Sequence, residues 1–196
     1  MAELLYQGHG SFRIVANDKT VIYVDPYAGE GYGLPADIVL VTHQHHDHNC
    51  VDLPARKPGC VVVTPEEALE GGVHNTFTIH SIAIEAVEAG NAKHDPTECV
   101  GYILVVDGVK LYAAGDTSQT RQMETFAGKN LEYALLPCDG IYNMNPAEAG
   151  ECARLMGAKH NIPIHTAPGV LFSMEQALRF PDINRLIVEP GQSIML

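Results

Sequence analysis

The segment THQHHDHN, residues 42–49, holds four histidines and one aspartate. It follows the apolar run ADIVLV, which is typical of a buried strand, and a loop at the end of such a strand is where folds present functional groups. Neutral imidazole and carboxylate are ligands that zinc and similar divalent ions prefer. His43, His45, Asp47 and His48 are therefore candidate metal ligands, enough for two ions or for one ion and a base.

Extended backbone divides these four side chains into two pairs. Positions two apart in an extended segment point the same way, so His43 and His45 can reach one ion. Asp47 and His48, beyond a bend, can reach another. His46 points elsewhere in this scheme, and we interpret it as a solvated side chain at the rim of the pocket.

Two metal ions about 3.5–4 Å apart need further ligands from other strand ends. Three residues stand at comparable positions: His94 in NAKHDP, Asp116 in AAGDT and His165 in IPIHT. Asp116 and His165 each follow an apolar, strand-like run, as His43 does. His94 lies instead in a polar loop between IAIEAVEA and CVGYILVV.

Strands in the first half of the chain, and alternating strands and helices in the second half, must position these residues. Apolar patterns and turn residues predict strands over residues 11–16, 20–25, 37–42, 60–64 and 78–89. A hairpin is predicted over 99–116, with its tight turn at Asp107–Gly108. Helices are predicted over 65–71, 118–127, 145–157 and 173–180, and further strands over 133–139, 160–165 and 185–190.

No linker, repeat or low-complexity segment divides the 196 residues, so we expect one domain over 1–196. Strands first, then alternating strands and helices, predict a mixed α/β or α+β fold with helices outside the sheets. Pattern alone does not choose between a two-sheet sandwich and an open sheet.

The histidine segment resembles a known motif, the H-x-H-x-D-H sequence of the metallo-β-lactamase superfamily. YVDPY, with Asp25, resembles the first motif of that family; KHDP, GDT and IPIHT resemble the third, fourth and fifth, in the same order along nearly the whole chain. The opening GHGSFRI and the segment YALLPCDGIYNMNPAEA are similar to the branch that contains ascorbate-6-phosphate lactonase and N-acylethanolamine phospholipase D.

The resemblance implies a four-layer αββα sandwich with a dinuclear metal site at one edge of its two sheets. By the family pattern one ion is held by His43, His45 and His94, the other by Asp47, His48 and His165, and Asp116 bridges them. His74 and His80 compete for the place of His94. We prefer His94 because of its spacing from the strand that leads to Asp116, and because His80 lies within an alternating strand pattern.

The resemblance also implies roles in catalysis. A hydroxide that bridges the two ions is the expected nucleophile, and Asp47 orients it and takes a proton. Asp25 is expected to hydrogen-bond a ligand histidine and fix its tautomer. Tyr142 and Asn143 are candidates for hydrogen bonds to an oxyanion or a leaving group. Asn145 is interpreted as the N-cap of the following helix.

We therefore expect a metal-dependent hydrolase of a small-molecule ester, lactone or phosphodiester. The cofactors are two divalent ions, zinc first, with manganese or iron as alternatives. The alternative function is a non-hydrolytic metalloprotein, either an iron-dependent redox protein or a metal-dependent ligand sensor. A net charge of −12, from 24 acidic and 12 basic residues, disfavours nucleic acid as a partner.

Location and redox state follow from simpler features. No stretch of the sequence reads as an export signal or as a membrane span, so we expect a cytoplasmic protein. Five widely spaced cysteines without a C-x-x-C pair are expected to be free thiols. The sequence leaves the oligomeric state, the substrate and the native metal open.

Overall fold

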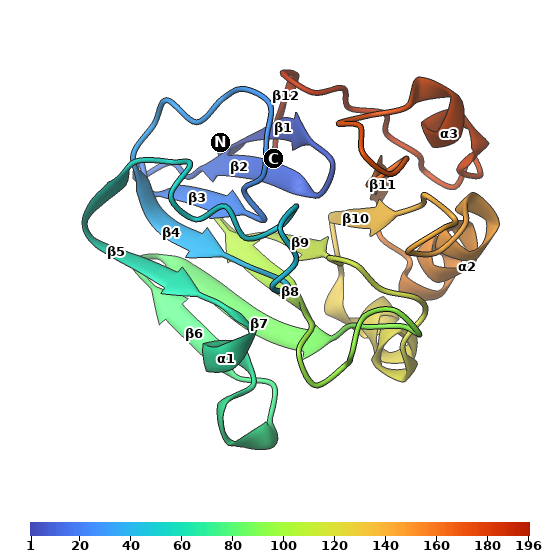
Figure 1. Cartoon of the computed structure of the whole chain (residues 1–196), viewed down its shortest axis with the longest axis horizontal. Coiled ribbons are helices and arrows are strands. Elements are labelled where there is room, and N and C mark those ends of the chain that lie inside the picture. Colours follow the sequence, from blue (N-terminus) through green and yellow to red (C-terminus); the bar gives the residue numbers. More distant parts are fainter.

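Two six-stranded sheets pack face to face in the computed structural model, which describes residues 1–196 (Figure 1). The first sheet has the order β12-β1-β2-β3-β4-β5. Its strands are β1 (Glu3–Gly8), β2 (Ser11–Val15), β3 (Val21–Val24), β4 (Ala36–Leu40), β5 (Arg56–Val63) and β12 (Ser193–Met195). The second has the order β11-β10-β9-β8-β7-β6. Its strands are β6 (Thr76–Ile79), β7 (Ile82–Glu88), β8 (Val100–Val106), β9 (Val109–Ala113), β10 (Tyr133–Pro137) and β11 (His160–Ile164).

The main core fills the space between the sheets. Apolar side chains that alternate along the strands, such as Leu4 and Tyr6 or Tyr102 and Leu104, point into one cluster of 26 buried residues. Burial of this apolar surface is the main force that holds the two sheets together. Helix α1 (Pro65–Ala68) follows β5 and adds Ala68 to the same cluster. A short 3₁₀ helix, η1 (Glu70–Gly72), comes next.

Helices cover the outer face of the second sheet only (Figure 1). A second core of 17 buried residues joins that face to α2 (Pro146–Met156), to the 3₁₀ helix η2 (Arg121–Lys129) and to Phe180, which follows α3 (Met174–Arg179). On the first sheet the outer cluster is small, and loop residues Tyr32 and Val51 pack against it. The predicted mixed α/β fold with two packed sheets is confirmed. The resemblance implied a helical layer outside each sheet, and on the first sheet loops form that outer layer instead.

Strand direction brings the functional segments to one edge of the sandwich. β3, β4 and β5 run parallel to one another, as do β9, β10 and β11. β1 and β7 have the same directions as β3 and β9, because each is separated from that strand by one antiparallel neighbour. The chain therefore leaves eight strands at the same edge: β1, β3, β4 and β5 of the first sheet and β7, β9, β10 and β11 of the second. The residues that follow them include His9, Asp25, His43, His94, Asp116, Asp139 and His165.

Two predictions from local sequence patterns are confirmed. β8 and β9 form the predicted hairpin, with Val106 opposite Val109 and positive φ angles of 52° at Asp107 and 86° at Gly108. Helix α2 begins as predicted at Asn145, whose side chain accepts hydrogen bonds from the Ala147 and Glu148 amides. Both follow from short-range backbone chemistry.

Three predicted elements and two omitted strands need correction. The stretch 78–89 is not one strand, because His80 and Ser81 form a turn between β6 and β7. Residues 118–127 give a 3₁₀ rather than an α-helix, and its buried residues Met123 and Phe126 are three apart, which suits three residues per turn. The predicted strand at 185–190 is absent except for a single bridge at Arg185. β1 was not predicted, nor was β12, which pairs with β1.

None of the helices combines the length and the apolar character needed to cross a bilayer. All five cysteines are free, as predicted.

Candidate metal centre

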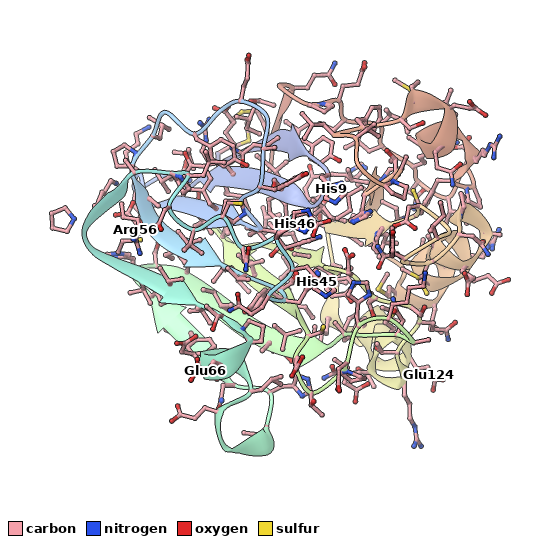
Figure 2. All side chains as sticks on the ribbon, viewed as in Figure 1. His9, His45, His46, Arg56, Glu66 and Glu124 are labelled. Atoms are coloured by element: carbon pink, nitrogen blue, oxygen red, sulfur yellow. The ribbon has the colours of Figure 1, made fainter.

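The strand-end loops bring all seven predicted ligands into two groups that meet at Asp116. One group consists of His43, His45 and His94, whose ligand atoms lie within 4.8 Å of one another. The other holds Asp47, His48 and His165 at the same spacing, together with a residue that was not predicted, His9. Figure 2 shows His9, His45 and His46 gathered at this edge of the two sheets.

Asp116 lies between the groups with each carboxylate oxygen turned to imidazole. Its Oδ1 is 3.3 Å from His48 Nε2. Its Oδ2 is 3.3 Å from His94 Nε2 and 3.4 Å from His165 Nε2. With imidazole beside each oxygen, this carboxylate can contact two ions at once. The side chain is buried and has little contact with solvent.

The chemistry of the donor set fits metal ions. His43 Nε2, His48 Nε2 and Asp116 Oδ1 are buried and none has a hydrogen-bond partner within the protein. Buried polar atoms without partners are costly, and nearly all are paired in native proteins. Three such atoms belong to one group of potential ligands. No neighbouring side chain forms a hydrogen bond with any of the three atoms. A divalent ion would contact all three at once.

Asp25 orients His48 from behind. Its Oδ2 accepts hydrogen bonds from His48 Nδ1 at 2.8 Å and from the Thr42 hydroxyl at 2.7 Å, and its Oδ1 accepts from the Thr42 amide at 2.7 Å. Because Nδ1 carries the proton, Nε2 of His48 faces Asp116 as the potential ligand atom.

His165 has a carboxylate neighbour in Asp139, which was not predicted. The Asp139 Oδ2 atom lies 2.9 Å from His165 Nδ1. Asp139 Oδ1 also accepts from the backbone amides of Ile141 and Tyr142, and its Oδ2 from the Asn143 side chain at 2.9 Å. Asn143 is therefore buried against Asp139.

His9 was missed because a single histidine between two glycines carries no ligand pattern. It follows β1, is buried, and its Nε2 lies 3.1 Å from Asp47 Oδ2. Its Nδ1 lies 3.3 Å from the Val170 carbonyl oxygen. Nε2 is thus turned towards Asp47 and the second group of ligands. Its position at a strand end was the signal that could have found it.

Left-handed backbone marks three of these strand ends. The φ angles are 57° at His9, 45° at Asp25 and 43° at His165, a region that residues other than glycine rarely adopt. Such conformations cost free energy and cluster at functional sites. All three turn the chain sharply as it leaves a strand, towards the same site.

The charges of the site perturb several pKa values. Burial and the neighbouring His48 lower the pKa of His43 to about 2. Burial opposes protonation of His48 too, but Asp116 and Asp25 raise its pKa to about 9. Burial would raise the pKa of Asp116, yet His48, His165 and His43 lower it to about 2. For Asp47, the hydrogen bond from His9 and the charge of His48 outweigh burial and hold the pKa below its usual range.

These shifts predict how pH changes the stability of the metal-free protein. His48 has a raised pKa, so its stabilising contribution is complete below its ordinary pKa of about 6.5 and is lost as pH rises to about 9. His43 has a lowered pKa, so its contribution is complete above about pH 6.5 and falls in acid. We expect the free energy of unfolding in urea, with a chelator present, to be greatest near pH 6.5. A steady rise from there to pH 9 would contradict the charge assigned to His48.

Gly10 leaves the space that the His48 ring needs. A Cβ atom at this position would lie 2.7 Å from His48 Cε1 and 3.1 Å from its Nδ1. We expect Gly10→Ala to displace the ring, to destabilise the protein by about 1–3 kcal/mol, and to weaken metal binding roughly 10–100-fold. Gly33→Ala is the matched control, because no atom lies within 4 Å of a Cβ there. Equal metal affinity in the two variants, measured by competition with a chromogenic chelator, would refute this account.

The site opens into a cavity of about 570 Å³. Asp47 and Tyr142 line it, with Tyr142 46% exposed, whereas Asn143 does not. His46 is 86% exposed at the rim, as its interpretation requires. His74 and His80, the competitors of His94, are exposed beside η1 and in the β6–β7 turn, and neither joins the ligand groups.

Comparison with known proteins places this site in a family. Residues 3–165 match the model of the Beta-lactamase superfamily domain, so the chain belongs to the metallo-β-lactamase superfamily. It is 30% identical to a UPF0173 metal-dependent hydrolase from Nitratidesulfovibrio vulgaris, over 98% of this chain and 95% of that protein. Within the superfamily it therefore groups with the UPF0173 metal-dependent hydrolases.

Two further relatives cover all or nearly all of the chain. A UPF0173 metal-dependent hydrolase from Thermococcus onnurineus is 27% identical, with 100% of both chains covered. The structure of Igni18, a metallo hydrolase from Ignicoccus hospitalis, is similar with a TM-score of 0.79, over 98% of this chain and 97% of that one. At 22% identity the second comparison bears on the fold alone.

Proposed function

We propose that this chain, as one domain over residues 1–196, hydrolyses a small-molecule ester, lactone or phosphodiester with two divalent ions. The observation that carries the proposal is the pair of ligand groups on either side of the buried Asp116 carboxylate. His43, His45 and His94 would hold one ion, and Asp47, His48 and His165 the other, with Asp116 shared. Zinc suits these ligands best, with manganese and iron as alternatives.

When bound, such ions polarise the scissile carbonyl or phosphoryl oxygen and lower the pKa of water to near neutrality. The protein has to keep its ligands in place and to handle protons. Asp47 is 23% exposed and lines the cavity, so its carboxylate can orient a water molecule and accept a proton from it. Tyr142 also lines the cavity, and its hydroxyl is our candidate for a hydrogen bond to an oxyanion or a leaving group.

His9 belongs to the second group in this proposal. Its Nε2 has the spacing of a ligand atom relative to Asp47, His48 and His165. We expect His9→Ala to weaken binding of one of the two ions by about 10–100-fold and to leave the other ion nearly unaffected. Stepwise zinc titration measures this difference, and two unchanged binding steps would remove His9 from the site.

Two features support a small substrate. The cavity has the volume of a small-molecule site, and the net charge of −12 opposes binding of polyanions. Lactones and phosphodiesters are the first compounds to test, because several motifs of the chain resemble the branch that contains ascorbate-6-phosphate lactonase and N-acylethanolamine phospholipase D.

Elemental analysis of protein purified without chelator, followed by assay of lactones and aryl phosphodiesters, tests the proposal. About two zinc or manganese ions per chain and turnover of either class would support it. About two iron ions without hydrolysis would favour the alternative, a non-hydrolytic metalloprotein, and such a protein would be coloured. Absence of tightly bound metal would refute both.

A further inference from the structure

A single cationic side chain stands at the mouth of the site. Two cavities, of about 570 and 660 Å³, share three lining residues: His45, Lys93 and His94. Of the 12 lysines and arginines in the chain, Lys93 is the one that lines either cavity. Apart from Lys93 and the histidines, the ionisable side chains that line the two cavities are mainly carboxylates, among them Asp47, Asp116, Glu66 and Glu98.

The Lys93 ammonium forms no ion pair with a carboxylate. Other lysines make ion pairs, for example Lys57 with Asp37 at 2.6 Å and Lys129 with Glu85 at 2.8 Å. No carboxylate oxygen lies within 4.0 Å of the Lys93 ammonium, which lies instead 4.7 Å from the centroid of the Tyr142 ring. A cation over an aromatic face is held by the ring but keeps its hydrogen-bond donors for another group.

The backbone around Lys93 is fixed by Asn91. The Asn91 side chain donates to the Tyr142 carbonyl at 3.0 Å and accepts from the Lys93 amide at 2.8 Å. The same oxygen lies 3.0 Å from Nδ1 of His94, the neighbouring potential ligand. Asn91 thus joins the loop after β7 to the loop after β10, and it places Lys93 and Tyr142 together beside the metal ligands.

We propose that Lys93, supported by the Tyr142 ring, binds an anionic group of the substrate at the mouth of the cavity. The substrate is then an anionic ester, lactone or phosphodiester, with a carboxylate or phosphate group apart from the bond that is cleaved. This inference rests on the proposed hydrolase function. A lysine on an otherwise acidic wall would both attract such a substrate and orient it with its reacting group towards Asp116.

Two synthetic esters test the proposal. para-Nitrophenyl hydrogen adipate and para-nitrophenyl methyl adipate share the bond that is cleaved and differ by one negative charge at the far end, and the diacid is too long for its own carboxylate to attack the ester readily. The readout is the ratio of kcat/KM for the anionic ester to kcat/KM for the neutral ester, with zinc-loaded protein. We expect Lys93→Met to lower this ratio roughly tenfold, mainly through KM of the anionic ester. Lys93→Arg should keep the ratio within about threefold.

Three controls separate the contact from general charge effects. Lys159 is exposed, pairs with Glu132 and lines neither cavity. Lys159→Met removes the same charge as Lys93→Met and should leave the ratio unchanged. Tyr142→Phe, which keeps the ring, should preserve the ratio, whereas Tyr142→Ala should lower it. Added sodium chloride should lower the ratio in the wild-type protein more than in Lys93→Met. Zinc content and far-ultraviolet circular dichroism verify that each variant is folded.

The outcomes distinguish this inference from the function on which it rests. An unchanged ratio in Lys93→Met, with both esters hydrolysed, would overturn the anion site and leave the hydrolase intact. If neither ester is hydrolysed, hydrolysis of such esters is refuted, and calorimetric titration with adipate and its neutral diamide decides the anion site separately. Binding of adipate roughly tenfold weaker in Lys93→Met than in Lys159→Met would support it, and equal binding would refute it.

Discussion

Replacement of Asp116 with alanine is expected to remove metal binding and activity together. The carboxylate is within reach of both ligand groups, with oxygens 3.3 Å from His48 Nε2 and from His94 Nε2. Without it neither ion keeps its full set of ligands, and the loss of hydrolysis should be at least about a thousandfold. Metal content after gel filtration and the rate on the substrate found by the lactone and phosphodiester assays measure the two effects.

The controls for Asp116 separate charge from shape. Asp116→Asn keeps the volume of the side chain but has one oxygen and no charge, so it should lose at least one ion. Asp52→Ala removes an exposed carboxylate that pairs with Arg56, and it should leave metal content and rate unchanged. If Asp116→Ala keeps both ions, Asp116 does not link the two groups and the dinuclear proposal fails.

Asp25→Ala is expected to have the largest effect on stability. It leaves three buried donors without an acceptor: the Thr42 amide, the Thr42 hydroxyl and Nδ1 of His48. Buried groups that lose a charged partner typically cost about 3–5 kcal/mol. The His48 ring also loses the partner that fixes its tautomer, so metal affinity should fall by about 10–100-fold. Urea unfolding and zinc titration measure the two consequences separately.

Asp18→Ala provides the matched comparison for Asp25. Asp18 also accepts hydrogen bonds, from Thr20 and Ser81, but it is exposed. We expect a loss of about 0.5 kcal/mol or less and no change in metal affinity. Similar losses of stability in the two variants would mean that the Asp25 contacts are not buried in solution as they are in this structure.

The sequence predicted correctly those features that depend on neighbouring residues, such as strand ends, tight turns and helix caps. His43, Asp116 and His165 could be predicted because each follows a long apolar run, and strands that run in the same direction end at the same edge of a sheet. The turn at Asp107–Gly108 and the cap at Asn145 depend on a few neighbouring residues, so local pattern was sufficient for them.

Other features depend on contacts between distant residues, which local pattern does not contain. His9 and Asp139 gain their places only when β1 and β10 are aligned with the strands that carry Asp47 and His165. β12 is a strand because its backbone pairs with β1 at the other end of the chain. His94 was preferred to His80 from the sequence, but one reason was wrong: His80 is exposed in the β6–β7 turn and does not lie within a strand.

The spread of the ligands along the chain has a consequence for assembly. The potential ligands run from residue 9 to residue 165 and come from strands of both sheets. Bound ions would therefore act as cross-links that close very long loops between the two sheets. Formation of such loops costs chain entropy, so a complete site exists only after both sheets have packed. We expect metal uptake to be a late event in folding, and bound metal to slow unfolding more than it speeds folding.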